Sequence, residues 1–225
     1  MREPGRSSYA PVSCRAGSPV DPARVRGAGI VLIVVRHGQT RANASGLLLG
    51  HADPKLDATG RAQASAIAAS LAPLPRSTRI ITSPLRRARE TASIITREAP
   101  VEVDDRWIEL DYGAFDGTPI GDVPAETWTR WRSDPDFAPE GGETLRELGA
   151  RVAAACEDLL PDAEERDVVV VTHVSPVKAS VAWTLGVGDE IAWRTFVAPG
   201  SITRIGVRHA RPVLLSFNET PMQSP

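Results

Sequence analysis

Two histidines follow directly after two runs of branched apolar residues, and this placement is the first indication of chemistry in the sequence. Arg36 and His37 come after Ile30–Val35, and His173 comes after Val168–Thr172. Such runs are typical of strands buried on both faces of a parallel sheet. Open α/β sheets bind their ligands at the carboxyl ends of these strands. One histidine at a strand end is usually structural, but two in equivalent positions favour a shared site.

Arginines follow a third predicted strand, Arg79–Thr82. Ser83-Pro84 is a typical helix start, with Ser83 as the cap and Pro84 at the first position of a helix over Pro84–Arg97. Three arginines lie in its first turns: Arg86, Arg87 and Arg89. Their charge opposes the helix dipole, and a bound anion would relieve that repulsion. The alternative is a solvated basic face, and both hold if one arginine points to the site and the others to water.

The arginines and His37 together suit phosphoryl transfer. Arg36 and Arg87 can bind the oxygens of a transferring phosphoryl group and neutralise its charge. His37 is the candidate nucleophile, which attacks phosphorus through a neutral ring nitrogen and forms a phosphohistidine. Its other nitrogen is expected to donate to a backbone carbonyl across the turn at Gly38. Glycine at that turn allows the backbone to approach a ligand closely.

Two further residues complete the predicted reaction. Glu109, in the loop Trp107–Gly117, is suited to protonate the leaving oxygen and then to activate water. His173, if protonated, adds a hydrogen-bond donor to the phosphoryl group. Because arginines and an imidazolium supply positive charge, no metal and no cofactor is expected, and the sequence has no Cys and His spacing typical of a metal site.

These residues resemble the histidine phosphatase superfamily, in the branch with cofactor-dependent phosphoglycerate mutases and α-ribazole phosphatases. Five segments match its motifs in order, over roughly Ile30–Val207: Arg36–Thr40 with Asn43; Ser83–Ala88 with Thr91-Ala92; Glu109 with Tyr112-Gly113 and Asp116-Gly117; Gly141–Thr144; and Val171–His173. Ordered agreement of several motifs is far more specific than any one of them. The resemblance implies a phosphohistidine at His37 and selects Arg87 as the phosphate-binding arginine. It also implies a set of substrate or phosphate ligands: Arg36, Asn43, Arg87, Thr144, His173 and Val174.

Departures from the family pattern favour a phosphatase over a mutase. Val174 stands where the family usually has glycine, and Val171–Lys178 resembles the acid phosphatase domain that some bacteria fuse to a ribonuclease H domain. No ribonuclease H region fits in this chain. Leu47–Leu49 is apolar where the family's loop often carries Arg and Gln near the substrate, which argues against phosphoglycerate recognition. The insertion that covers the mutase site is also absent.

The favoured function is therefore a metal-independent phosphomonoesterase of the histidine acid phosphatase type, acting on a small phosphorylated metabolite. One alternative is a cofactor-dependent phosphoglycerate mutase, which needs a bisphosphate primer. The other is a non-catalytic phospholigand-binding relative, although its nucleophile, arginines and acid are all present. The sequence does not specify the metabolite, and both a monomer and a homodimer are compatible with it.

Composition agrees with a globular enzyme. The chain has 225 residues, of which 42% are hydrophobic and 24% charged, and its net charge is −2. This charge argues against a nucleic-acid or membrane partner, and no apolar run reaches the length of a membrane span. Two cysteines, Cys14 and Cys156, make no disulfide framework, so a cytoplasmic setting is expected. Residues 1–29 are expected to be a disordered extension, 30–218 the catalytic domain and 219–225 a tail.

The remaining segments alternate between strands and helices, which predicts a three-layer α/β/α sandwich with a mostly parallel central sheet. Helices are expected from Asp57 to before Pro73 (with Asp57 or Thr59 as cap), over Glu143–Leu160, and over Pro176–Leu185 after Ser175. Further strands are expected at Val101–Val103, Ser201–Val207 and Val213–Phe217, and a long loop at Thr40–Asp57. Trp128 and Trp131 are read as packing residues and Cys156 as a buried apolar one. His51 and His209 are read as ordinary loop histidines, Asp111 and Asp116 as turn formers, and Gln39 and Thr40 as shaping the first turn.

Overall fold

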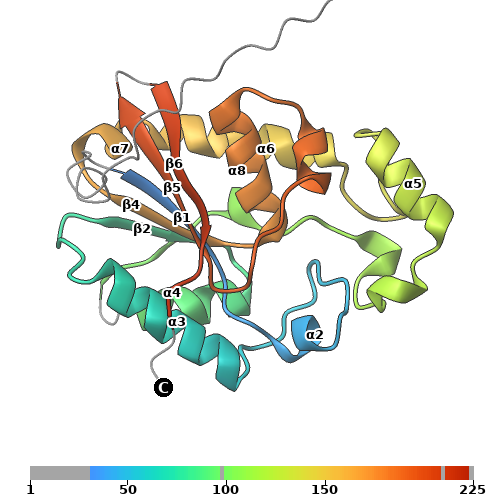
Figure 1. Cartoon of the computed structure of the whole chain (residues 1–225), viewed down its shortest axis with the longest axis horizontal. Coiled ribbons are helices and arrows are strands. Elements are labelled where there is room, and N and C mark those ends of the chain that lie inside the picture. Colours follow the sequence, from blue (N-terminus) through green and yellow to red (C-terminus); the bar gives the residue numbers. More distant parts are fainter. Residues whose placement is uncertain (1–30, 97–98, 209–210, 223–225) are drawn as a thin grey trace, which may run out of the picture.

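One six-stranded sheet forms the centre of the computed structural model, which describes residues 31–96, 99–208 and 211–222 (Figure 1). The strands lie in the order β3-β2-β4-β1-β5-β6. Their bounds are β1 Val31–Arg36, β2 Arg79–Thr82, β3 Glu102–Val103, β4 Val168–Thr172, β5 Ile202–Arg208 and β6 Arg211–Glu219. The pairs from β3 to β1 are parallel, whereas β5 pairs antiparallel with β1 and β6 with β5. The sheet is therefore mostly parallel, as predicted.

The central strands are buried on both faces. In β1, Leu32 and Val34 belong to one core cluster, whereas Ile33 and Val35 belong to the other. This alternation follows from the two-residue period of a strand. It explains why the sequence run is apolar throughout rather than at every second position.

Helices cover both faces of the sheet (Figure 1). The cluster with Ile33 and Val35 also contains apolar side chains of α3 (Ala58–Leu71) and α4 (Arg86–Thr96). The cluster with Leu32 and Val34 contains those of α6 (Leu145–Leu159) and α8 (Val174–Leu185). The fold is thus a three-layer α/β/α sandwich. Shorter elements are α2 Arg41–Ala44, η1 Asp105–Trp107, η2 Gly113–Phe115, η3 Ile120–Asp122, α5 Ala125–Ser133, α7 Asp162–Glu165 and η4 Asp189–Trp193.

Three predicted helix starts were wrong by two residues. Helix α6 begins at Leu145 rather than Glu143, after Thr144 at its N-cap. Helix α4 begins at Arg86 rather than Pro84, and the N–H of Leu85 donates to the Ser83 hydroxyl at 3.3 Å. Helix α8 begins at Val174 rather than Pro176, directly after His173 at its N-cap. A proline is tolerated in the first turn because the N–H groups there have no partner within the helix. The predicted long loop also contains α2, which Thr40 caps.

Other expectations were confirmed or lie outside the described residues. Asp57 caps α3, and its carboxylate accepts from the N–H of Gly60 at 2.7 Å. The rings of Trp128 and Trp131 stack at 5.6 Å, and Cys156 is a buried free thiol. Residues 1–29 and His209 are not described, and β6 ends one residue beyond the predicted domain boundary. In the described part of the chain, no helix is both long and apolar enough to cross a membrane.

Candidate active site

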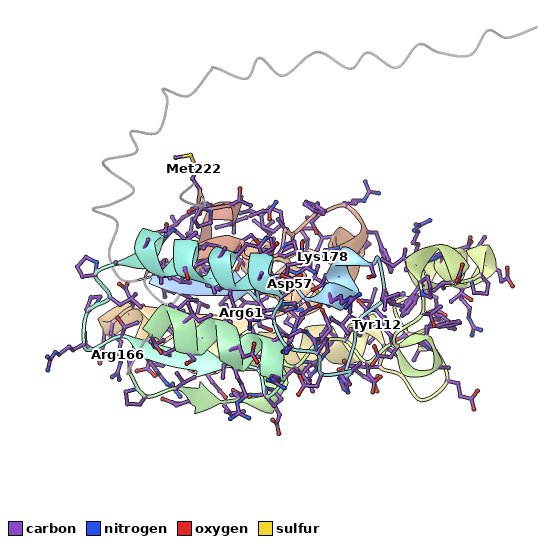
Figure 2. The ribbon with its side chains drawn as sticks, turned by 90° about the horizontal axis from the view of Figure 1, so that it is seen from below. Asp57, Arg61, Tyr112, Arg166, Lys178 and Met222 are labelled. Atoms are coloured by element: carbon purple, nitrogen blue, oxygen red, sulfur yellow. The ribbon has the colours of Figure 1, made fainter. Side chains whose placement is uncertain are left out.

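The two predicted histidines meet at the carboxyl edge of the sheet. Strands β1 and β4 are paired in register, with Arg36 opposite Thr172, and the N–H of His37 donates to the Thr172 carbonyl at 2.8 Å. The ring centroids of His37 and His173 are 5.0 Å apart, and both side chains are buried. Figure 2 shows Arg166, just before β4, near one end of the molecule and well away from Tyr112. The two histidines lie at the other end of β4, where the parallel strands end.

Two hydrogen bonds fix the orientation of the His37 ring. Nδ1 lies 2.7 Å from the carbonyl oxygen of Gly38, and Nε2 lies 3.2 Å from Nε of Arg87. Because a carbonyl only accepts and Arg87 only donates, Nδ1 carries the proton, and Nε2 carries the lone pair that accepts from Arg87. The hydrogen bond across the Gly38 turn is the one that the sequence predicted.

Glycine is required at position 38 for a reason other than the expected one. A Cβ there would lie 2.2 Å from the carbonyl oxygen of Gly60. The backbone at the start of α3 therefore leaves no room for a side chain at position 38, and the close approach of a ligand stays a prediction.

Arg87 is the one arginine of its cluster that points into the site. Its side chain is buried, and its Nε donates toward His37 Nε2 and His173 Nδ1, both at 3.2 Å. Its Nη1 and Nη2 donate to the carbonyls of Ala52 and Gly50, both at 2.7 Å. The neighbours Arg86 and Arg89 are exposed, so one arginine faces inward and the others face water, as predicted.

His173 is oriented by a residue that the sequence placed only as a helix cap. Its Nε2 lies 2.6 Å from the hydroxyl of Ser83, at the end of β2. Since Nδ1 accepts from Arg87, Nε2 carries the proton and donates to Ser83. Ser83 follows a third parallel strand, as His37 and His173 follow theirs, and this position in the sequence could have identified it as a site residue.

Burial and positive neighbours favour the neutral form of both imidazoles. Burial lowers the pKa of His37 well below its usual value, and Arg87 and Arg36 lower it further. The pKa of His173 is lowered well below its usual value, first by burial and then by Arg87. Neutral His37 suits a nucleophile, whereas the protonated His173 considered from the sequence is disfavoured in these surroundings.

Arg36 brings a second guanidinium to the same edge. Its Nη1 donates to the Val197 carbonyl at 2.6 Å. Its Nε is buried and has no hydrogen-bond partner among the described residues. A buried N–H without a partner is costly, and an anionic oxygen would satisfy it.

The carboxyl group of Glu109 is buried beside the start of α8. Its Oε1 accepts from the N–H of Leu110 at 2.8 Å and from the N–H of Ser175 at 3.2 Å. The second bond uses a first-turn N–H that the helix leaves free. In the residues that the structure describes, Oε2 takes part in no hydrogen bond.

The backbone of Glu109 is held by two side chains that the sequence analysis did not select. Its carbonyl accepts from Arg151 Nη2 at 3.2 Å and from His51 Nε2 at 3.0 Å. Arg151 also binds the carbonyls of Arg106 and Ile108 and pairs with Glu143 at 2.6 Å. His51 is therefore more than an ordinary loop histidine.

Three predicted ligands lie at helix starts. Asn43 Oδ1 accepts from the N–H and hydroxyl of Thr40, which closes the cap of α2. The Thr144 hydroxyl makes the equivalent contacts with Glu147 at the start of α6, and Val174 is the first residue of α8. Within the described segments, no hydrogen bond joins these three residues to the histidines, Arg36 or Arg87. Their role in substrate binding stays a prediction.

Comparison with known proteins identifies the family. A family model of the histidine phosphatase superfamily (branch 1) matches residues 32–220. The chain belongs to this superfamily. The ordered motifs of the sequence had indicated the same assignment.

Similar proteins include several named phosphatases. Phosphoserine phosphatase 1 of Hydrogenobacter thermophilus is 32% identical over 197 residues, which cover 85% of this chain and 93% of the relative. A bifunctional protein of Mycobacterium tuberculosis is 30% identical over 193 residues, or 83% of this chain, but the chain spans only 53% of that relative. The mycobacterial glucosyl-3-phosphoglycerate phosphatase in complex with VO3 has a TM-score of 0.74 and 30% identity, covering 84% of this chain and 99% of that one. Phosphoserine phosphatase from Entamoeba histolytica in complex with 3-phosphoglyceric acid has a TM-score of 0.77 and 27% identity, covering 84% of this chain and 97% of that one.

Proposed function

We propose that this protein is a metal-independent phosphomonoesterase of the histidine acid phosphatase type, with residues 30–218 as its catalytic domain. The observation that carries the proposal is the orientation of a neutral His37, whose Nε2 lone pair points toward Arg87. A nucleophile of this kind requires a deprotonated nitrogen directed at the phosphorus atom. The proposed substrate is a small phosphorylated metabolite, and the proposed setting is the cytoplasm.

In the first step, the phosphoryl oxygens bind Arg36 and Arg87 while Nε2 of His37 attacks phosphorus. The bond from phosphorus to the ester oxygen breaks, and Glu109 donates a proton to that leaving oxygen. A phosphoryl dianion between the imidazoles offsets the repulsion from the arginines and thereby favours protonated His173 as a donor. The products of this step are the free alcohol and phospho-His37.

In the second step, the Glu109 carboxylate takes a proton from water, and the oxygen of that water attacks phosphorus. The bond between phosphorus and Nε2 breaks, which releases inorganic phosphate and restores neutral His37. The arginines supply the positive charge in both steps, so this route contains no step that requires a metal.

The identity of the substrate is supported only as a class. The similar proteins named above act, by their names, on phosphoserine and on glucosyl-3-phosphoglycerate. Leu48 and Leu49, which lie where the family's loop often carries Arg and Gln, are buried in this structure. This burial agrees with a phosphatase rather than a phosphoglycerate mutase.

The test is phosphate release from para-nitrophenyl phosphate in the presence of EDTA, comparing wild type with His37→Ala. We expect the variant to lose about 10³-fold or more of kcat. A radiolabelled phosphoryl group on wild type, stable to base and labile to acid, would identify the phosphohistidine. A wild type that isomerises phosphoglycerate instead of releasing phosphate would favour the mutase. A wild type that binds phosphate esters without turning them over would favour the binding protein.

A further inference from the structure

Two loops of the site are joined along their backbones. The N–H of Gly117 donates to the Leu48 carbonyl at 2.7 Å, and the N–H of Leu48 donates to the Thr118 carbonyl at 2.8 Å. A further bond of 2.9 Å runs from the Ile120 N–H to the Gly46 carbonyl. The segment that follows the nucleophile therefore lies along the segment that follows Glu109.

Asp116 makes the contact at the end of this ladder nearest the site. Its Oδ1 accepts from the N–H of Gly50 and its Oδ2 from the N–H of Ala52, both at 2.7 Å. These partners are 66 and 64 residues away in the chain. Asp116 is therefore not the local turn former that the sequence suggested.

The same two residues hold Arg87 through their carbonyls. Gly50 and Ala52 each receive one Nη hydrogen bond from Arg87 at 2.7 Å. Each residue is thus held on its N–H side by Asp116 and on its C=O side by Arg87. The carboxylate and the guanidinium act on opposite sides of one short stretch of backbone.

This arrangement determines which edge of Arg87 faces the histidines. A guanidinium has five N–H donors, and two of them are bound to the carbonyls of Gly50 and Ala52. Nε is then directed between His37 and His173, and the remaining donors are available to a phosphoryl group. Without fixed carbonyls the guanidinium would rotate about its side-chain bonds and lose this alignment.

We propose that Asp116 is a positioning residue, which holds residues 50–52 so that Arg87 keeps its Nε between the two histidines and its remaining N–H donors toward the phosphoryl group. The proposal rests on the phosphatase function, because it concerns the same reaction. A carboxylate is needed because both of its oxygens accept, whereas an amide would direct its NH2 group toward one of the two backbone N–H groups. The negative charge of Asp116 also favours the protonated form of Arg87, whose pKa burial lowers.

The experiment compares Asp116→Asn with the exposed control Asp122→Asn. We would measure kcat/KM for para-nitrophenyl phosphate and the dissociation constant for orthovanadate. Misplacing a catalytic group by about 1 Å can cost about 10²-fold in rate, so we expect both quantities to worsen by about 10- to 100-fold in Asp116→Asn. The control should stay within about twofold. An Asp116→Asn protein that matches the control would overturn the proposal.

A double-mutant cycle separates positioning from general structural support. In an Arg87→Ala background, Asp116→Asn should change orthovanadate affinity by less than about threefold, because its effect passes through Arg87. Additive losses would overturn the positioning role. If Asp116→Asn fails to fold, Asp116→Glu, whose longer side chain displaces both acceptor oxygens from Gly50 and Ala52, takes its place in the cycle.

Orthovanadate binding also separates this proposal from the proposed function. A wild type that binds orthovanadate but hydrolyses nothing would contradict the phosphatase, yet a weaker affinity in Asp116→Asn would still support positioning. A wild type that hydrolyses para-nitrophenyl phosphate, with Asp116→Asn unaffected, would contradict the positioning role alone.

Discussion

The two halves of the site are held in place by different means. The strand-end half contains His37, His173 and Ser83, which follow β1, β4 and β2 directly. Main-chain pairing places them: the N–H of His37 and the N–H of Ser83 donate to carbonyls of β4 at 2.8 and 3.0 Å. The loop half contains Glu109 and residues 46–52. Main-chain bonds join residues 46–48 to residues 117–120, but the stretch next to the histidines is held by long-range contacts from side chains to its backbone.

Substitutions are therefore expected to act differently in the two halves. In the strand-end half, a substitution removes one functional group and leaves the ladder intact. In the loop half, one charged side chain binds the backbone of several residues, so its loss alters both the loop conformation and the positions of the catalytic groups. Arg87 belongs to both halves, because it contacts the two histidines and the loop carbonyls.

Of the substitutions that test this contrast, Arg87→Lys is expected to have the largest effect on activity, since it breaks the link between the halves. A lysine keeps the charge but cannot hold two carbonyls and both imidazoles together. We expect kcat/KM to fall by about 10²- to 10³-fold, as for the loss of a preorganised donor. Steady-state kinetics with para-nitrophenyl phosphate would measure it, with exposed Arg89→Lys as the control. A loss below about tenfold would show that a positive charge at position 87 is enough for activity. It would contradict the need for a guanidinium that contacts both halves.

Arg151→Met tests how strongly the loop half depends on one side chain. The substitution removes hydrogen bonds to three carbonyls and leaves Glu143 without its partner, where the two side chains are 19% and 18% exposed. Breaking a pair of this kind should lower the free energy of unfolding by about 2–4 kcal/mol. Urea denaturation would measure the change, and kcat should fall as the backbone of Glu109 loosens.

The control is Arg146→Met on the same helix, α6. Arg146 pairs with Asp136, but both side chains are about 60% exposed. An exposed pair contributes little, so the urea midpoint should hardly move. Equal losses in the two variants would contradict the contrast between buried and exposed arginines.

The strand-end half is the part that the sequence predicts well. Strands β2 and β4 have the predicted bounds, and His37 and His173 lie where two apolar runs end. The reason is physical: the two-residue period and burial of a strand are local properties, and main-chain pairing brings successive strand ends together. The Gly38 carbonyl was predictable for the same reason, since it is adjacent in the chain.

The loop half could not be predicted in this way. Arg151 and Asp116 act on backbone N–H and carbonyl groups that lie 42 to 66 residues away in sequence. Every residue except proline has both of these groups, so the sequence contains no sign of which one is bound. The start of α8 was predicted wrongly for a related reason. The Ser175-Pro176 pair suggested that the helix begins at Pro176, but the N–H of Ser175 lies in the first turn and binds the distant Glu109.

Ser83→Ala should have a moderate effect confined to the strand-end half. It removes the acceptor that lies 2.6 Å from Nε2 of His173 and so frees the ring to change its orientation. We expect kcat/KM to fall by about tenfold, which corresponds to about 1.4 kcal/mol of transition-state stabilisation. The urea midpoint should change much less than in Arg151→Met. A larger change in stability than in rate would contradict the division into two halves.

Near neutral pH, the titration of His37 should have a smaller effect on the free energy of unfolding than Arg151→Met. Burial and the neighbouring arginines lower its pKa well below 6.5, so the imidazole stays neutral as the pH falls from about 8 to about 6.5. Below pH 6.5 the unfolded chain binds a proton that the folded chain does not, so the free energy of unfolding falls with falling pH. An NMR titration of His37 with a midpoint at or above 6.5 would contradict this assignment.

Arg86→Ala should have the smallest effect, although Arg86 is adjacent to Arg87 in the sequence. Its side chain is 58% exposed and pairs with Glu90 one turn along α4, at 2.7 Å. Pairs of this spacing contribute about 0.3–0.5 kcal/mol, and kcat/KM should stay within about twofold of wild type. Kinetics and urea denaturation on the same sample would measure both. A loss comparable to that of Arg87→Lys would mean that the net charge of the helix start, and not the inward orientation of Arg87, determines activity.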